Sequence, residues 1–203
     1  MSGTISRCQR EAGGSIPLTR SKIMKTICVF LSASDLPEKY TKPAEKLGRL
    51  FAKNNYGFMY GGSHLGLMKV MSSAVKKAGG KVIGISTELF KHVRWLDADE
   101  MIVTKDLLKR KQIMSERSDA TVVMVGGLGT LDEFSELMAL KKYGKYDKPI
   151  IFLNTDNFYA GLKALLRRME KEKFNKGKLG DMVLFADTPS QVIKILANTL
   201  GDK

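Results

Sequence analysis

The chain has 203 residues, with 34 Lys and Arg against 21 Asp and Glu, and carries a formal net charge of +13. Its length fits one domain, and 43% hydrophobic with 27% charged residues excludes a wholly disordered chain. Two cysteines are too few for a disulfide scaffold, and no apolar run reaches the roughly 18–20 residues that cross a bilayer. The charge leaves open nucleic acid, a membrane surface or an anionic small molecule as partner.

The excess charge is concentrated in two segments. Residues 1–25 carry a net charge of +4 and residues 141–180 a net charge of +7. The first segment has no apolar period, and we interpret it as a disordered leader from an early start codon, with a transit peptide as the alternative. The second is interpreted as a solvated helix face followed by a loop at 175–180. The basic residues of that face are Lys163, Arg167, Arg168 and Lys171.

Strand-like and helical patterns alternate along the rest of the chain. Short apolar runs without polar alternation predict strands buried on both faces, hence a parallel sheet. The alternation predicts a doubly wound, Rossmann-like α/β domain over residues 26–203, with helices on both faces of the sheet. The predicted strands are 27–33, 58–60, 81–86, 101–103, 121–125 and 149–154, and the predicted helices are 38–54, 65–79, 106–118, 130–143, 157–172 and 189–200.

In such a sheet, ligands bind at the carboxyl ends of the strands, so the strand-to-helix junctions are the candidate sites. At the first unusual junction, Gly61, Gly62 and Ser63 follow a strand, and Gly66 lies in the opening turn of a helix. Paired glycines allow a backbone to approach an anion closely. A tight turn with close helix–strand packing explains the same residues equally well.

A second glycine-rich junction follows the strand at 121–125. Gly126, Gly127 and Gly129 lead to Thr130, which we expect to start a helix that carries Glu133. The spacing is neither a dinucleotide fingerprint nor a Walker loop. A carboxylate beside a glycine loop suggests phosphate binding next to general-base chemistry. The alternative is that Thr130 and Glu133 form a capping box, as the Thr188–Gln191 sequence also can.

The third junction places two basic residues, Arg110 and Lys111, near the start of a helix. Arg110 shares a helix face with Leu107 and Met114, because it lies three residues after one and four before the other. An arginine on an inward face needs a buried anion, either Glu133 or a phosphate. The alternative is an ion pair with Asp106 in the preceding turn.

Three motifs together resemble a known family. YGGSHLGLM at 60–68, Arg110-Lys111 ahead of Ser118-Asp119-Ala120, and GGLGTLDE at 126–133 are similar to the motifs YGGGxxGLM, RKxxM and PGGxGTxxE of the LOG family. Its members are cytokinin riboside 5′-monophosphate phosphoribohydrolases, long misnamed lysine decarboxylases. The similarity extends from about residue 26 to the last helix.

The resemblance implies a Rossmann-like subunit that forms a homodimer or larger homo-oligomer, with the site near the dimer interface. It implies hydrolysis of the N-glycosidic bond of a nucleoside 5′-monophosphate to free base and ribose 5-phosphate. The family's catalytic pair falls on Arg110 and Glu133. The expected substrate- and phosphate-binding residues are Ser32, Gly61, Gly62, Lys111, Gly126, Gly127, Gly129 and Thr130, and Ser34 lies near the same stretch.

The residues fit this chemistry, with two departures from the family motifs. Glu133 can stabilise positive charge on the ribose, orient its hydroxyls or activate water, and these roles stay open. We expect no cofactor and no metal, because His64 and His92 lack ligand spacing. Val125 replaces the family's proline and Ser63 its third glycine. Both departures put the substrate and the rate in question.

Two other functions compete with hydrolysis. The departures from the motifs are compatible with a non-catalytic nucleotide-binding or sensing protein on the same fold. The net charge taken alone suggests a nucleic-acid-binding protein, but the chain lacks an aromatic stacking array or a recognition helix. We therefore expect a cytoplasmic enzyme that acts on a mononucleotide and binds neither membrane nor nucleic acid.

Overall fold

The structure is a computed structural model that describes residues 24–174 and 178–201. The expected leader therefore lies, up to residue 23, outside the described residues. Residues 175–177 of the expected loop lie outside them too. The rest of that loop differs from the expectation, because Leu179–Met182 forms a short helix, α6. Four residues are too few to give a helical period in the sequence.

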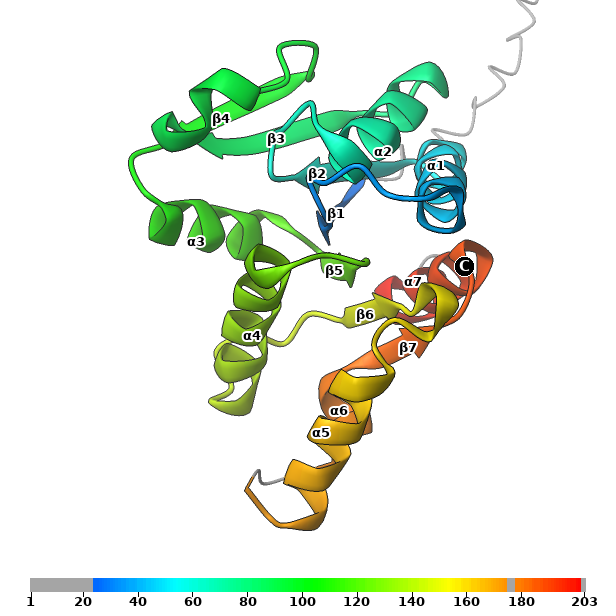
Figure 1. Cartoon of the computed structure of the whole chain (residues 1–203), viewed down its shortest axis with the longest axis vertical. Helices are drawn as coiled ribbons and strands as arrows, with labels where there is room; N and C mark the ends of the chain where they lie inside the picture. Colours follow the sequence, from blue (N-terminus) through cyan, green and yellow to red (C-terminus); the bar gives the residue numbers. More distant parts are fainter. Residues whose placement is uncertain (1–23, 175–177, 202–203) are drawn as a thin grey trace, which may run out of the picture.

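Parallel strands form one seven-stranded sheet in the order β4-β3-β2-β1-β5-β6-β7 (Figure 1). The sequence predicts six of these strands and misses β7, whose three residues give no alternation. The strands are β1 (Lys25–Phe30), β2 (Tyr56–Tyr60), β3 (Val82–Thr87), β4 (Glu100–Thr104), β5 (Ala120–Val123), β6 (Ile150–Leu153) and β7 (Leu184–Ala186).

Helices cover both faces of this sheet. On one face lie α1 (Glu38–Lys53), α2 (Gly66–Lys77) and α7 (Pro189–Leu200). On the other lie α3 (Leu107–Arg117), α4 (Leu128–Lys142) and α5 (Ala160–Lys171), with α6 beside α5 (Figure 1). Two 3₁₀ segments, η1 (Glu88–Val93) and η2 (Thr155–Asn157), follow β3 and β6.

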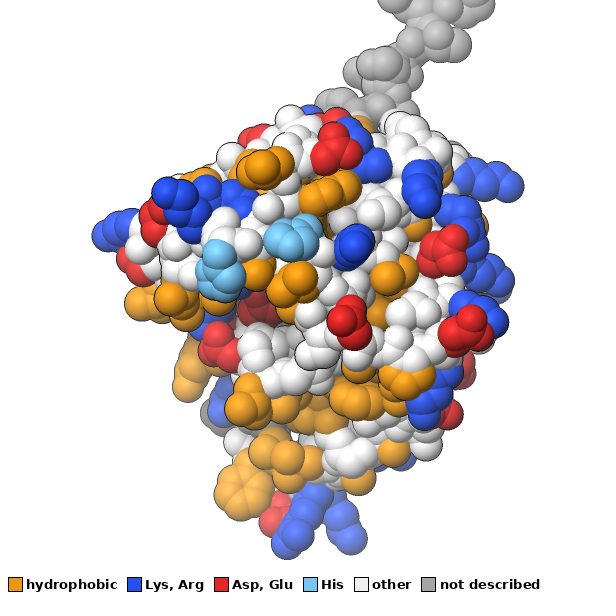
Figure 2. Space-filling view, turned by 45° about the horizontal axis from the view of Figure 1, so that its top comes forward, with side chains coloured by type: hydrophobic (Ala, Val, Ile, Leu, Met, Phe, Trp, Pro, Cys, Tyr) orange, Lys and Arg blue, Asp and Glu red, His pale blue; other side chains and the backbone are white. Residues whose placement is uncertain are grey.

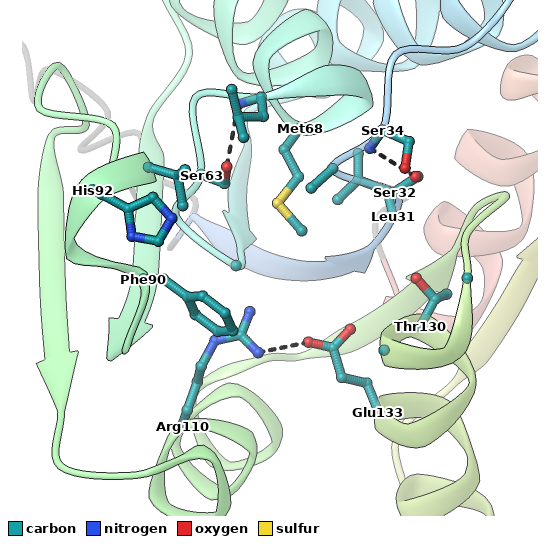
Figure 3. A pocket seen from close by; sticks show the side chains of 16 residues that line it. Leu31, Ser32, Ser34, Ser63, Met68, Phe90, His92, Arg110, Thr130 and Glu133 are labelled. Carbon is teal, nitrogen blue, oxygen red and sulfur yellow. Dashed lines mark hydrogen bonds and ion pairs between the residues drawn. The ribbon is translucent and has the colours of Figure 1, made fainter. Parts of the chain in front are cut away.

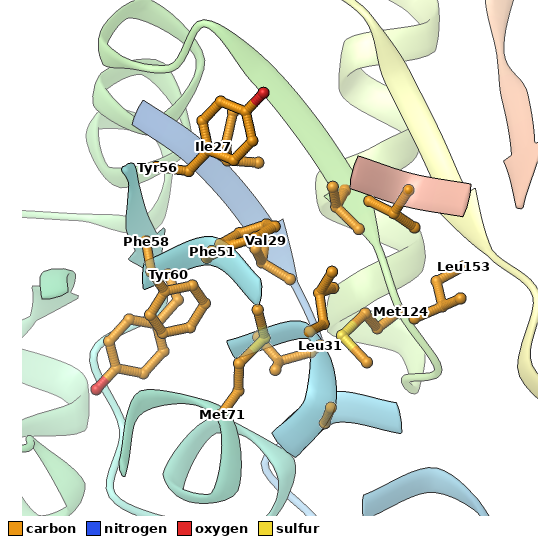
Figure 4. Packing of buried hydrophobic residues seen from close by; sticks show 14 of the residues in the cluster. Ile27, Val29, Leu31, Phe51, Tyr56, Phe58, Tyr60, Met71, Met124 and Leu153 are labelled. Carbon is orange, nitrogen blue, oxygen red and sulfur yellow. The ribbon is translucent and has the colours of Figure 1, made fainter. Parts of the chain in front are cut away.

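Strand β1 shows why the sheet is buried on both faces. Ile27 and Val29 pack in the cluster with α1, α2 and α7, whereas Cys28 and Phe30 pack in the cluster on the opposite face. All four side chains are at most 3% exposed. Figure 4 shows the first cluster, where Phe51 of α1 packs against Val29. Because successive side chains are buried on opposite faces of the sheet, both sets are apolar, and the sequence shows no polar alternation.

The strand order reverses direction at β1, which is the topological switch point of the sheet. From β1 the chain proceeds to β2 on one side, and β5 lies on the other side of β1. Such a switch point leaves a crevice at the carboxyl ends of the central strands, where ligands bind in doubly wound folds. The predicted fold class, a Rossmann-like parallel sheet with helices on both faces, is confirmed.

Positive charge lies mainly around the margins of the face in Figure 2, not in one continuous stripe. On α5, Arg167, Arg168 and Lys171 are exposed, as the sequence predicts. Lys163 is half-buried instead, with its Nζ 4.7 Å from the centroid of the Phe185 ring. Within the described part of the chain, no helix combines the length and apolar character needed to cross a membrane.

Candidate functional site

A cavity of about 460 Å³ opens at the carboxyl ends of β1, β2, β3 and β5. This is the edge of the sheet on which the sequence places the candidate site, and the volume lies in the range of small-molecule pockets. The cavity is lined by these predicted site residues: Ser32, Gly61, Arg110, Gly127, Gly129, Thr130 and Glu133.

A buried ion pair crosses this cavity. Arg110 Nη1 donates to Glu133 Oε1 at 2.9 Å, and the two residues are 6% and 7% exposed (Figure 3). Arg110 Nε also donates to the carbonyl of Ile85 at 2.8 Å, which fixes the guanidinium at the end of β3. The alternative pairing with Asp106 is wrong, because that carboxylate caps α3 by accepting from the Lys109 amide. Burial favours Glu133 because a fully desolvated guanidinium needs an anionic partner.

Burial also changes the protonation of this pair. Desolvation raises the pKa of Glu133 above its ordinary value, while the charge and hydrogen bond of Arg110 act in the opposite direction. The Glu133 carboxyl therefore binds a proton more readily than an exposed glutamate does. A carboxyl with a raised pKa beside a fixed cation is a common feature of sites that handle protons or developing positive charge.

The start of α4 differs from the sequence prediction. The helix begins at Leu128 with Gly127 as its N-cap residue, and no side chain caps it. Thr130 is thus its third residue rather than its start, and the capping-box interpretation of Thr130 and Glu133 is wrong. The first amide that donates within this helix is that of Leu131, to the Gly127 carbonyl. The preceding amides face the cavity end of the helix, where its dipole favours an anion.

The glycines of this site serve different purposes. A Cβ on Gly126 would lie 2.1 Å from Thr130 Oγ1, and one on Gly61 would lie 2.3 Å from Arg110 Nη2. These two glycines are therefore required by packing inside the protein. A Cβ on Gly127 or Gly129 would meet nothing within 4 Å. Because both line the cavity, their missing side chains leave space for a ligand.

The loop after β1 is tied to the glycine loop. The Ser32 amide donates to the Val125 carbonyl at 3.1 Å, and Ser32 Oγ accepts from the Ser34 amide at 3.0 Å. The Ser32 carbonyl in turn accepts from the Met68 amide of α2 at 3.2 Å. Ser32, Ser34 and Met68 all line the cavity, so the loop after β1 and α2 meet at its upper wall in Figure 3.

Three predicted site residues do not line the cavity. Gly62, with φ +74°, supports the turn after β2 and packs against Met101. Gly126 packs against Thr130. Lys111 points toward the outer side of α4, where Nζ contacts Asp132 at 3.0 Å and Glu136 at 2.6 Å. Adjacent helical residues point about 100° apart, so Lys111 cannot share the direction of Arg110.

The sequence reasoning missed one wall of the cavity. Phe90, His92 and Val93, all from η1, line it. Segment η1 has six residues and no apolar period, so it gave no element to predict. Because η1 directly follows β3, the tendency of ligands to bind at the carboxyl ends of the strands could have pointed to it.

The sequence of this chain is similar to those of known proteins. A family described as "possible lysine decarboxylase" matches residues 68–196. The probable cytokinin riboside 5′-monophosphate phosphoribohydrolase LOGL2 of Oryza sativa subsp. japonica is 30% identical, over 92% of this chain and 78% of that protein. The chain belongs to the LOG family. The Mycobacterium tuberculosis cytokinin riboside 5′-monophosphate phosphoribohydrolase is 34% identical, over 70% of this chain and 76% of that protein.

A solved structure adds a relative that is named for a different role. The molybdenum cofactor binding protein from Rippkaea orientalis is 29% identical with a TM-score of 0.67, over 87% of this chain and 98% of that one. The LOG family relatives above are hydrolases, and this chain is an enzyme of that family. The same fold thus also occurs in a protein named for binding a cofactor.

The two departures from the LOG motifs have defined places. Val125 is 2% exposed in the core, and its carbonyl accepts from the Ser32 amide. Ser63 Oγ accepts from the Leu65 amide at 3.2 Å, so its hydroxyl is turned to the backbone of its own loop. Neither displaces Arg110 or Glu133. In residues 24–174 and 178–201, no group of three or more His, Cys, Asp or Glu side chains is arranged to hold a metal ion.

Proposed function

We propose that this cavity hydrolyses the N-glycosidic bond of a nucleoside 5′-monophosphate, releasing free base and ribose 5-phosphate. The observation that carries the proposal is the buried Arg110–Glu133 pair, which faces the same cavity as the uncapped start of α4. One feature suits the reacting sugar and the other suits a phosphate. The names of the relatives support the same reaction.

The 5′-phosphate belongs at the start of α4. Amides of the first helical turn that have no intrahelical acceptor, together with the helix dipole, bind anions. Gly127 and Gly129 leave open space beside these amides. Phosphate oxygens can therefore approach the backbone, which a side chain at either position would obstruct.

The ribose then lies over the ion pair. Breaking the bond between C1′ and the base nitrogen sends the electron pair to the base and leaves positive charge on the sugar ring. Glu133 Oε1 is held by Arg110, and Figure 3 shows the other carboxylate oxygen facing the cavity. This oxygen stabilises the developing charge. Water adds its oxygen to C1′, and the proton it releases replaces the sugar on the base.

A product assay tests the proposal. The protein is incubated with AMP and with an N6-substituted AMP, and free base and ribose 5-phosphate are quantified. Both products are expected in equal amounts from at least one nucleotide. The Glu133→Gln variant should lose this turnover while its circular dichroism spectrum stays that of the wild type. Unchanged turnover in that variant would refute the assignment of Glu133.

A cavity that binds a nucleotide without cleaving it is the second candidate, and the cofactor-binding relative from Rippkaea orientalis is the observation that favours it. In that case AMP would raise the Tm of the protein without any product. The two candidates differ in a single measurement, because equimolar base and ribose 5-phosphate can arise only by cleavage.

Self-association is part of the proposal. Leu108 of α3 and Leu128 of α4 are 73% and 84% exposed at the beginnings of two helices that flank the cavity. Large exposed apolar side chains next to a site favour an interface between copies. Analytical ultracentrifugation should give a dimer or a larger oligomer, and Leu108→Glu with Leu128→Glu should shift the protein toward the monomer.

A further inference from the structure

The cavity has two chemically different ends. At one end the start of α4 presents Thr130, and at the other end η1 presents Phe90 and His92 (Figure 3). The Arg110–Glu133 pair lies between them. The first end offers amides and a helix dipole, whereas the second offers an aromatic ring. The order along the cavity is therefore anion-binding, charged and aromatic.

A nucleoside monophosphate has its parts in the same order: phosphate, ribose and base. We propose that Phe90 is the residue on which the base stacks, so that the site gains affinity from the base as well as from the phosphate. This inference rests on the proposed function, because it takes the phosphate to lie at α4 and the ribose over the ion pair. The base then lies toward η1, where Phe90 lines the cavity.

The aromatic wall is held in place by the neighbouring loop. The Trp95 amide donates to the Gly62 carbonyl at 2.8 Å, and the His64 amide donates to the Val93 carbonyl at 2.9 Å. Ser63 and Arg94 form an isolated antiparallel bridge between the same two segments. The end of η1 is thus fixed to the loop after β2, so the segment that carries Phe90 is held in place before any ligand binds.

Phe90 itself is half-buried, and its ring centroid is 5.9 Å from Arg110 Cζ. Arg110 is already fixed by Ile85 and Glu133, so it does not need this contact for its orientation. Stacking of a base on an aromatic side chain is tolerant of base identity, but a purine overlaps the ring with two fused rings. Loss of such a stacking contact weakens binding by about tenfold or more.

The test compares three ligands on one variant. Dissociation constants of AMP, UMP and ribose 5-phosphate are measured by calorimetry for Phe90→Leu and for Phe90 intact, both in the Glu133→Gln background so that nothing is cleaved. Phe90→Leu should weaken AMP at least tenfold and UMP less, and should leave ribose 5-phosphate within about twofold. Phe90→Trp should retain AMP binding. Leu89→Ala, a 66% exposed neighbour that does not line the cavity, is the control.

The outcomes separate this inference from the proposed function. Equal losses for AMP and ribose 5-phosphate would show that Phe90 only positions Arg110, and would overturn the inference. No loss for AMP would overturn it as well, as would undetectable AMP binding with Phe90 intact. If the wild-type protein releases no base from any nucleotide while AMP binding still depends on Phe90, the proposed hydrolysis fails and the stacking role stands.

Discussion

The beginnings of α4 and α7 carry similar sequences and have different structures. In α7, Thr188 accepts from the Gln191 amide and Gln191 Oε1 accepts from the Thr188 amide, which completes a capping box. In α4, Thr130 lies two residues inside the helix, and Glu133 forms an ion pair with Arg110 instead. The protein satisfies amides of α7 with its own side chains, whereas no side chain caps α4.

The glycines before α4 cause this difference. The N-cap is Gly127, three residues before the Thr130 that a Thr-x-x-Glu capping box would use, and it has no side chain to accept from the first amides. This places Glu133 one turn further along, on the face toward α3, where Arg110 lies. The same type of sequence therefore caps α7, whereas in α4 it supplies Glu133 to the cavity.

The largest effect on turnover is expected at Glu133 of α4. Gln191, at the equivalent position of the Thr-x-x-Gln sequence of α7, is its control. Glu133→Gln should lower turnover of AMP by about 10²-fold or more, because it removes the charge that faces the ribose. Gln191→Ala should leave turnover unchanged and lower only the free energy of unfolding. Steady-state assays and urea unfolding of both variants test this. Equal turnover of AMP by Glu133→Gln and Gln191→Ala would contradict the role of Glu133 in the reaction.

A smaller effect, on affinity, is expected at Gly129. Its Cβ position is open, and alanine in a helix is more favourable than glycine, so Gly129→Ala should raise the free energy of unfolding by roughly 0.5–1 kcal/mol. The same methyl group would obstruct the phosphate and weaken AMP binding about tenfold. Gly161→Ala in α5, which also meets nothing within 4 Å, should stabilise without changing AMP binding. Equal AMP affinity in the two variants would place the phosphate elsewhere.

The pH dependence should reveal the burial of Glu133. Because desolvation raises its pKa above the ordinary 4.5, kcat/KM should fall on the acidic side at a pH above 4.5. Arg110→Gln removes a cation that lowers this pKa, so any residual activity should fall at still higher pH. A profile whose acidic limb lies at or below pH 4.5 would contradict the assignment.

The raised pKa of Glu133 also makes the free energy of unfolding depend on pH: activity is lost at low pH, whereas this stabilising contribution is lost at high pH. The folded pKa exceeds the unfolded one, so the stabilising contribution of Glu133 is present below the unfolded pKa and is lost as the pH rises through the folded pKa. Unfolding free energies measured between pH 4 and 8 should show this loss in the wild type. Glu133→Gln, which cannot ionise, should lack that component.

The smallest effect is expected at the cap of α7. Thr188→Ala removes the hydroxyl that accepts from the Gln191 amide and should cost about 1 kcal/mol of unfolding free energy. AMP turnover should stay at the wild-type level, because α7 contributes nothing to the cavity. Thermal unfolding measures the first quantity and the product assay the second. A loss of turnover in this variant would mean that capping of α7 is coupled to the site.

Sequence reasoning predicted the sheet and the inward direction of Arg110, because both rest on strong local signals, but it left Glu133 and a phosphate open as the partner of Arg110. The strands are uniformly apolar, and Arg110 stands on the same helix face as the buried Met114. Glu133 lines the cavity at the carboxyl-end edge of the sheet, as predicted, but its helix starts earlier than predicted, since Gly127 serves as an N-cap without a side chain. The three-residue strand β7 and the non-periodic segment η1 have no sequence pattern that predicts them. Because η1 was not predicted, the position of Phe90 in the cavity wall was not predicted either.

The most direct test of the account is the hydrolysis of AMP and adenosine by the wild-type protein under the same conditions. The two substrates share the base and the ribose and differ only in the phosphate assigned to the open amides of α4. We expect release of adenine from AMP, with kcat/KM for adenosine lower by 10²-fold or more. Equal rates for AMP and adenosine, or no adenine from either, would contradict the central claim that α4 binds the phosphate of a cleavable nucleotide.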